Sequence, residues 1–158
     1  MKLSWNSLRI SFAGARISHL VQKDKIWDHG TMIEQVKVVF VQLQKVIRYN
    51  DPGLIKKYTS VVGFHQIMEL VDRLQNEIDD KPIYELNEVN IIAATKGKNS
   101  RPDCFKALIK GRKTTAGLYS VAQGKYFGFK TEWTFMRQGN WWVLDSIKSI
   151  KKFSMHLS

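Results

Sequence analysis

Residues 126–150, YFGFKTEWTFMRQGNWWVLDSIKSI, decide the fold that the sequence predicts. Aromatic side chains occupy four of the five alternate positions from Phe127 to Phe135, the exception being Thr131. Successive side chains of a strand point to opposite faces of a sheet. The residues that share this face are Phe127, Phe129, Thr131, Trp133 and Phe135. Gln138-Gly139-Asn140 has the composition of a hairpin turn, and residues 141–150 return as the partner strand. The stretch therefore predicts an antiparallel hairpin with one aromatic face.

The chain upstream of this hairpin divides into helices first and strands after. Apolar residues at helical spacing predict helices over 3–21, from Thr31 to about Ile47, and over 64–78, with a short helix over 52–59 after the cap Asp51. Residues 83–95 and 103–111 predict two strands, separated by a turn cluster at 96–102. Residues 112–124 are predicted to be a polar loop.

This order of elements predicts an α+β fold, with N-terminal helices packed on a curved antiparallel sheet. Long aromatic strands that curl around the second helix are the cone-shaped arrangement of the nuclear transport factor two-like fold. The predicted organisation is a basic amphipathic helical segment at 1–26, one α+β domain at 27–150 and a basic tail at 151–158.

Three stretches resemble the Tim-forty-four-like domain, which is the C-terminal domain of the mitochondrial import-motor membrane adaptor and its bacterial relatives. They are NDPGLIKKYT at 50–59, EWTFMR at 132–137 and WVLDSI at 142–147. The resemblance covers roughly residues 27–150. It implies a non-enzymatic domain that docks a protein partner and associates peripherally with anionic membrane.

In that family the membrane contact is attributed to N-terminal amphipathic helices. The resemblance therefore directs attention to Trp5, Arg9, Phe12 and Arg16, which match in residue type and place. A basic amphipathic helix with aromatic anchors can lie on a membrane surface. The alternative is a helix that packs on its own domain or on a second copy in a homodimer.

The charge of the chain favours anionic partners. The net charge is +11, and residues 91–158 carry thirteen Lys and Arg against three Asp and Glu. RNA binding through this basic half is an alternative function. It is disfavoured because Phe129, Trp133 and Phe135, with Phe127 and Trp142, are better explained as core or pocket wall than as a stacking platform. No stretch is apolar enough for a transmembrane helix, and the single Cys104 cannot form an internal disulfide, which together predict a cytoplasmic or matrix-like location.

A further alternative is an enzyme of the isomerase or dehydratase type, because this fold also hosts such activities. These enzymes need a carboxylate or histidine inside an apolar cone. His65 is predicted to be a cap or a surface residue. Asp103 is predicted to begin a strand, and Glu132 is predicted to face solvent. Asp145 is the remaining catalytic candidate, because it can point inward. The histidines have no metal-ligand spacing and no phosphate-binding glycine loop occurs, so no metal or cofactor is expected.

Overall fold

The computed structural model describes residues 4–77, 83–114 and 127–150. Helices precede strands along the chain, as the sequence predicts. The elements are α1 (Trp5–Leu20), the 3-10 helix η1 (Lys25–Trp27), α2 (His29–Tyr49), the 3-10 helix η2 (Pro52–Tyr58), α3 (Val61–Glu77), β1 (Ile83–Thr95), β2 (Cys104–Thr114), β3 (Phe127–Gln138) and β4 (Trp141–Ser149). The described part of the predicted loop at 112–124 differs, because β2 continues to Thr114. The predicted tail at 151–158 lies outside the described residues.

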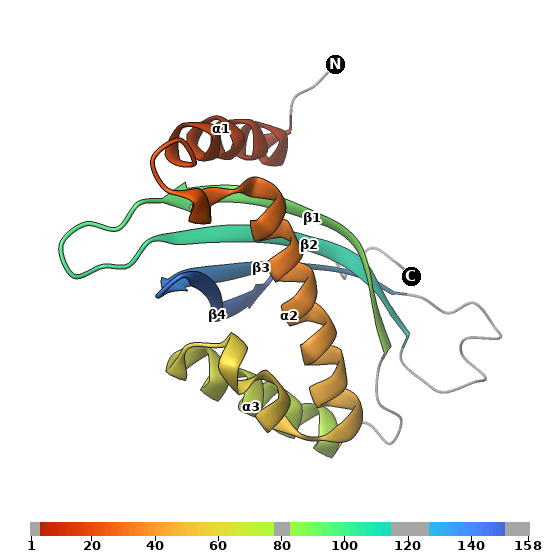
Figure 1. Ribbon diagram of the computed structural model, residues 1–158. Helices are drawn as coiled ribbons and strands as arrows, with labels where there is room; N and C mark the ends of the chain where they lie inside the picture. The colour runs from red at the N-terminus through yellow and green to blue at the C-terminus, as the bar shows by residue number, and fades with distance from the viewer. Residues whose placement is uncertain (1–3, 78–82, 115–126, 151–158) are drawn as a thin grey trace.

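The four strands form one antiparallel sheet in the order β1-β2-β3-β4. In Figure 1 the sheet curves, α1 lies along β1, α2 runs across the sheet and α3 lies beyond β4. The β3–β4 hairpin pairs Gln138 with Trp141 across Gly139-Asn140. Gly139 has a φ of 65°, which glycine adopts without strain at the first position of a tight hairpin turn.

The core lies between α2 and the concave face of the sheet. The buried face of α2 begins at Met32 and ends at Ile47, and the facing strands contribute Phe105, Trp133 and Phe135. The rings of Phe105 and Phe135 stack with their centroids 4.9 Å apart and an angle of 7° between their planes. Each large side chain buried in this way stabilises the fold by roughly 1.5–3 kcal/mol.

Helix side chains bond to the backbone of both edge strands of the sheet. At β1, Arg16 of α1 donates from Nε to the carbonyl oxygen of Ala94 at 2.9 Å. At β4, the side-chain amide of Gln66 donates to the carbonyl oxygen of Ile147 at 2.6 Å and accepts from its N–H at 2.9 Å. Gln66 therefore pairs with Ile147 as a residue of a neighbouring strand would, which satisfies the outward-facing backbone groups at this point of the edge.

Helix α3 approaches β4 so closely that its first turn requires a glycine. A Cβ atom on Gly63 would lie 2.2 Å from the carbonyl oxygen of Leu144. The N–H of Ser60 donates to that same oxygen at 3.0 Å. The helix is thereby fixed against the sheet edge, where its residue Leu70 contributes to the cone.

Candidate binding pocket

A cavity of about 440 Å³ lies in the cone between α2, α3 and the concave face of the sheet. Its walls are mostly apolar and aromatic. The helices contribute Phe40, Leu43, Gln44, Ile47 and Leu70. The strands contribute Tyr84, Lys113, Gly128, Phe129, Thr131, Trp133, Ile147 and Ser149.

Three aromatic rings shape one side of the cavity. Phe129 stacks on Phe40 with a centroid distance of 6.4 Å and an angle of 7°, and Tyr84 meets Phe129 edge-on at 5.6 Å. The Phe129 ring has room because position 111 is glycine. A Cβ atom on Gly111 would lie 2.7 Å from that ring and 2.0 Å from the carbonyl oxygen of Glu85. Gly111 thus allows the Phe129 ring to form this wall, because the Cβ atom of any other residue would collide with the ring and with the backbone of β1.

The polar groups along the cavity are few. The hydroxyl of Thr131 is buried and has no hydrogen-bond partner among the described residues. The side-chain oxygen of Gln44 accepts from the N–H of Tyr84 at 3.3 Å. Burial raises the pKa of the Tyr84 phenol above its usual value, so the phenol stays neutral at ordinary pH.

Among the described residues that line the cavity, Lys113 carries the only formal charge at neutral pH, and no Asp, Glu or His lines it. A carboxylate or histidine for general acid–base catalysis is therefore missing from this described lining. In the described ranges no group of three or more His, Cys, Asp or Glu side chains is arranged to hold a metal ion.

Asp145, the catalytic candidate from the sequence, does not line this cavity. Its Oδ1 accepts a hydrogen bond from the hydroxyl of Ser60 at 2.7 Å. The Ser60 hydroxyl oxygen in turn accepts from the N–H of Gly63 at 3.0 Å, which satisfies a free donor in the first turn of α3. Asp145 therefore orients a helix cap. His65 is exposed on α3.

Glu132 was predicted to face solvent, and this is wrong. Its side chain is only 15% exposed and lies within 3.4 Å of Arg9 and 3.7 Å of Lys106. The alternation along β3 correctly places Glu132 on the convex face, but α1 brings Arg9 over that face. Leu108 on the same face is also buried, at 1% exposure.

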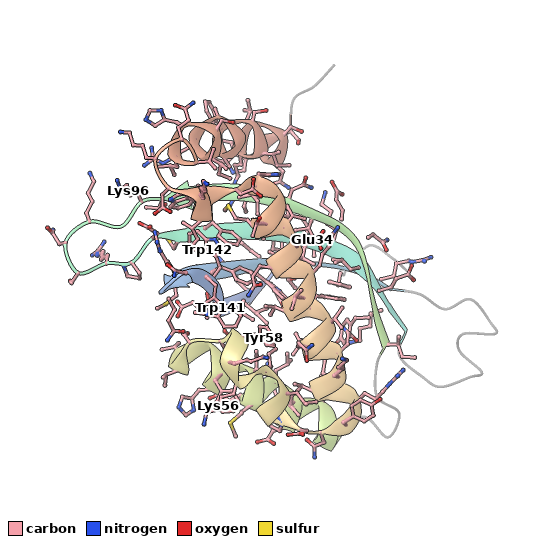
Figure 2. All side chains as sticks on the ribbon, in the orientation of Figure 1. Glu34, Lys56, Tyr58, Lys96, Trp141 and Trp142 are labelled. Carbon is pink, nitrogen blue, oxygen red and sulfur yellow. The ribbon has the colours of Figure 1, made fainter. Side chains whose placement is uncertain are left out.

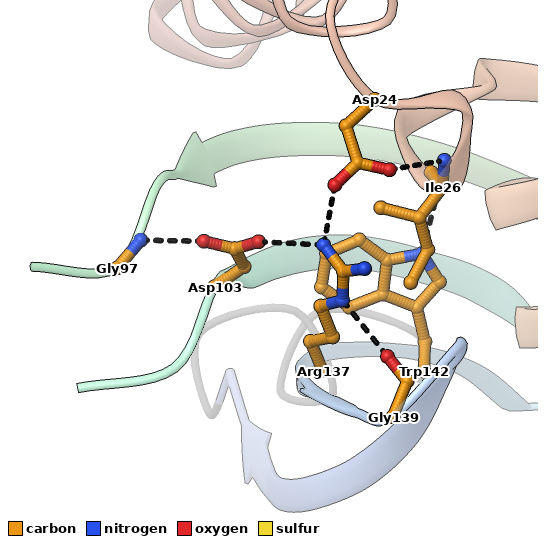
Figure 3. Close-up of polar contacts among 7 residues, drawn as sticks. All are labelled: Asp24, Ile26, Gly97, Asp103, Arg137, Gly139 and Trp142. Carbon is orange, nitrogen blue, oxygen red and sulfur yellow. Dashed lines mark hydrogen bonds and ion pairs between the residues drawn. The ribbon is translucent and has the colours of Figure 1, made fainter. Parts of the chain in front are cut away.

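Asp103 belongs to a polar cluster at the opposite end of the sheet from Lys113 (Figure 3). Arg137 contacts Asp24 at 2.5 Å and Asp103 at 3.3 Å, and Asp103 accepts from the N–H of Gly97 at 2.7 Å. The hydrogen bonds from Arg137 and from the N–H of Ile26 lower the pKa of Asp24 below its ordinary value. The cluster joins the segment after α1 to the β1–β2 turn, and each of its three charged groups is paired.

The predicted pocket-wall or core residues divide between the two roles. Phe129 and Trp133 line the cavity. Phe135 and Trp142 are buried in the core, and the indole N–H of Trp142 donates to the carbonyl oxygen of Ile26 at 3.0 Å. The side chain of Phe127 lies outside the described residues.

The residues of α1 that were predicted to form a membrane or partner surface also differ in their exposure. Trp5 and Phe12 are 71% and 72% exposed, whereas Arg9 and Arg16 are turned to the sheet and bonded to Glu132 and Ala94. Ala13, Ile17 and Leu20 of the same helix are buried in the core. Helix α1 is thus packed on its own domain, with two aromatic side chains left on its outer side.

The sequence reasoning overlooked a surface pair of aromatic residues. Tyr58 at the end of η2 and Trp141 at the start of β4 have ring centroids 5.6 Å apart, and Figure 2 shows them beside one another. Lys57 lies over the Tyr58 ring at 5.1 Å. The signal in the sequence that could have marked them is their position at the ends of elements, next to turns. None of the helices within the described ranges has the length and apolar character to cross a membrane.

Comparison with solved structures identifies the fold. An NTF2-like protein of unknown function from Pseudomonas putida KT2440 superposes with a TM-score of 0.55 at 12% identity, over 78% of this chain and 88% of that one. The intermembrane space region of the chloroplast protein ARC6 gives a TM-score of 0.47 at 8% identity, over 74% and 95% of the two chains. A variant of Rd1NTF2_05 gives 0.44 at 10%, over 75% and 99%.

The first of these similarities shows that the chain has the NTF2-like, or nuclear transport factor two-like, fold. It bears on the fold alone, because the sequence identity is low. The sequence matches no family model and no curated protein.

Proposed function

We propose that this domain is a non-catalytic binding protein whose cone holds a small, largely apolar ligand. The observation that carries the proposal is the cavity of about 440 Å³ with apolar and aromatic walls. Pockets for small molecules have volumes of roughly 300–1,000 Å³ and few polar groups among apolar ones. Gln44, Thr131 and Lys113 are polar groups of this kind.

The distribution of carboxylates supports binding over catalysis. An isomerase or dehydratase requires an acid or base at the substrate, and the described cavity lining offers the cation Lys113 and the neutral phenol of Tyr84. Asp145 is occupied in capping α3. The resemblance of residues 27–150 to the Tim-forty-four-like domain supports a non-catalytic role as well.

The proposal is tested by titrating octanol into the protein while methyl NMR spectra are recorded. Shifts should concentrate on Ile47, Leu70 and Ile147, which line the cavity, and should spare Ile55, which is buried away from it. The octanol recovered at the end should be unchanged. Shifts spread evenly over the molecule would contradict a site in the cone.

A filled cavity provides the matched control. Leu70→Trp adds bulk to the cavity wall and should abolish the octanol-induced shifts. Met68→Trp, on the exposed side of the same helix at 40% exposure, should leave them intact. Equal binding by both variants would place the ligand elsewhere.

A second candidate function is docking through the outer side of α1. The specific observation in its favour is the exposure of Trp5 and Phe12, which are seven residues apart and therefore lie on the same side of the helix. Aromatic side chains anchor helices at membrane surfaces and at protein interfaces. The Tim-forty-four-like resemblance supports peripheral association with anionic membrane at this place.

Removal of α1 is a poor test of docking, because it also removes Ala13, Ile17 and Leu20 from the core. The better variant is Trp5→Ser with Phe12→Ser. It should release the protein from sedimenting vesicles that contain anionic phosphatidylglycerol. The control Val61→Ser with Val62→Ser, two exposed apolar residues on α3, should not. If the unaltered protein stays in the supernatant, a membrane role for this surface fails.

A further inference from the structure

The cations on the two faces of β2 differ in whether they form ion pairs. Every cation on the convex face has a carboxylate partner on a neighbouring strand. The pairs are Lys106–Glu132 at 3.7 Å, Lys110–Glu88 at 3.9 Å and Arg112–Glu85 at 2.7 Å. Lys113 is the cation that faces the cavity, and no described carboxylate lies within ion-pair distance of its ammonium group.

Lys113 is also half-buried. Its Nζ lies 5.8 Å from the centroid of the Tyr84 ring, whose face attracts a cation but does not neutralise it. Desolvation of a cation without a counter-charge is unfavourable, so a half-buried lysine of this kind is better stabilised when an anion is bound beside it. The cavity is the space from which such an anion can approach.

The strand register places Lys113 at one end of the cavity. Lys113 pairs with Phe127 near the start of β3, whereas Ile109 pairs with Thr131. Lys113 and Ile109 are four residues apart along β2, which corresponds to about 13 Å at the usual rise of a strand. The wall beyond Thr131 is formed by Trp133 and Ile147. The cavity therefore combines one cationic end with a long apolar interior.

An adjoining groove between α2 and β1 extends the positive region. It shares Phe40, Gln44 and Tyr84 with the cavity. Its charged side chains are Lys37, Lys45, Arg48 and Glu85. Glu85 is engaged by Arg112, and Lys37 lies 3.6 Å from Glu34. An excess of one sign of charge beside a cleft attracts ligands of the opposite sign.

We infer that the ligand of the cone is an amphipathic organic anion, with its carboxylate or equivalent oxyanion at Lys113 and its apolar body directed toward Trp133. This inference rests on the proposed function and specifies the chemical class of its ligand. The apolar body replaces cavity water along Phe40, Leu43 and Ile147. The oxyanion accepts a charge-assisted hydrogen bond from the Lys113 ammonium group.

The test compares octanoate with octanol, two probes that share an apolar chain and differ in charge, by isothermal titration calorimetry at pH 7. Lys113→Met should weaken octanoate binding by about tenfold to a hundredfold, the range for a hydrogen bond to a charged group. Octanol binding should change less than about twofold. Lys113→Arg should retain octanoate, because it keeps the charge.

Lys110→Met is the matched control, since it removes the same charge from the opposite face of the same strand. It should change octanoate affinity less than about twofold at moderate salt, because its charge lies on the other face of the sheet, is paired with Glu88 and is screened. Equal losses in Lys113→Met and Lys110→Met would overturn the inference.

The two proposals fail in distinguishable ways. If octanol binds in the cone and Lys113→Met leaves octanoate affinity unchanged, the anionic class is wrong and the binding function stands. If neither octanol nor octanoate binds to the unaltered protein, the proposed binding function itself fails. Circular dichroism of each variant establishes that lost affinity is not lost folding.

Discussion

The unpartnered hydroxyl of Thr131 gives the sharpest prediction for stability. The hydroxyl is buried on the concave face of β3 and has no hydrogen-bond partner among the described residues. A buried polar group left unsatisfied costs about 1–3 kcal/mol. Thr131→Val replaces the hydroxyl by a methyl group of similar shape and favours the strand conformation. We expect the free energy of unfolding to rise by about 1 kcal/mol, the lower end of that range.

This gain is measurable by urea unfolding of the ligand-free protein. With a slope near 2 kcal/mol per molar, the urea midpoint should rise by about 0.5 M. Thr134→Val, on the convex face of the same strand, is the control and should stay within about 0.5 kcal/mol of the parent. If Thr131→Val instead lowers the free energy of unfolding by more than about 0.5 kcal/mol, the hydroxyl has a partner and the reasoning is refuted.

Three other predictions concern α3, the segment after α1, and β1. Gly63→Ala should lower the melting temperature, although alanine usually favours a helix, because its Cβ would collide with the carbonyl oxygen of Leu144; an unchanged or higher melting temperature would contradict this. Asp24→Asn should flatten the acid side of the stability–pH curve. The lowered pKa of Asp24 stabilises the fold above pH about 4, and this stabilisation is lost as the pH falls through the pKa of Asp24 in the folded protein. If the parent and Asp24→Asn lost the same free energy of unfolding on acidification, this prediction would be contradicted. Stability should also fall as the pH rises above about 10, because the raised pKa of Tyr84 keeps it protonated after the unfolded chain ionises, and Tyr84→Phe should remove part of this loss.

The position of α1 changes how its sequence is interpreted. Arg9 and Arg16 were predicted to face a membrane or a partner, and they instead bond to Glu132 and to the edge of β1. Most of the positive charge of this helix is therefore used inside the domain. Trp5 and Phe12 remain exposed, which makes the docking hypothesis depend on apolar contact more than on charge.

The order of the elements and the two faces of each strand could be predicted from the sequence. Alternation along a strand is a local property, so the concave side of β3 was readable from Phe129, Trp133 and Phe135 without knowledge of any partner. The cap Asp51 was readable for the same reason, since a capping side chain bonds to backbone two or three residues away.

Which groups meet across the chain could be learned only from the folded structure. Asp145 is tied to Ser60, and Glu132 to Arg9, over separations of 85 and 123 residues that no local pattern encodes. The same holds for the site. A lysine on a strand is ordinarily a solvated residue, and Lys113 becomes a candidate ligand contact only because folding places it on the cavity wall and leaves it without a described acid. Burial and pairing are properties of the assembled fold, and they determine what each charge can do.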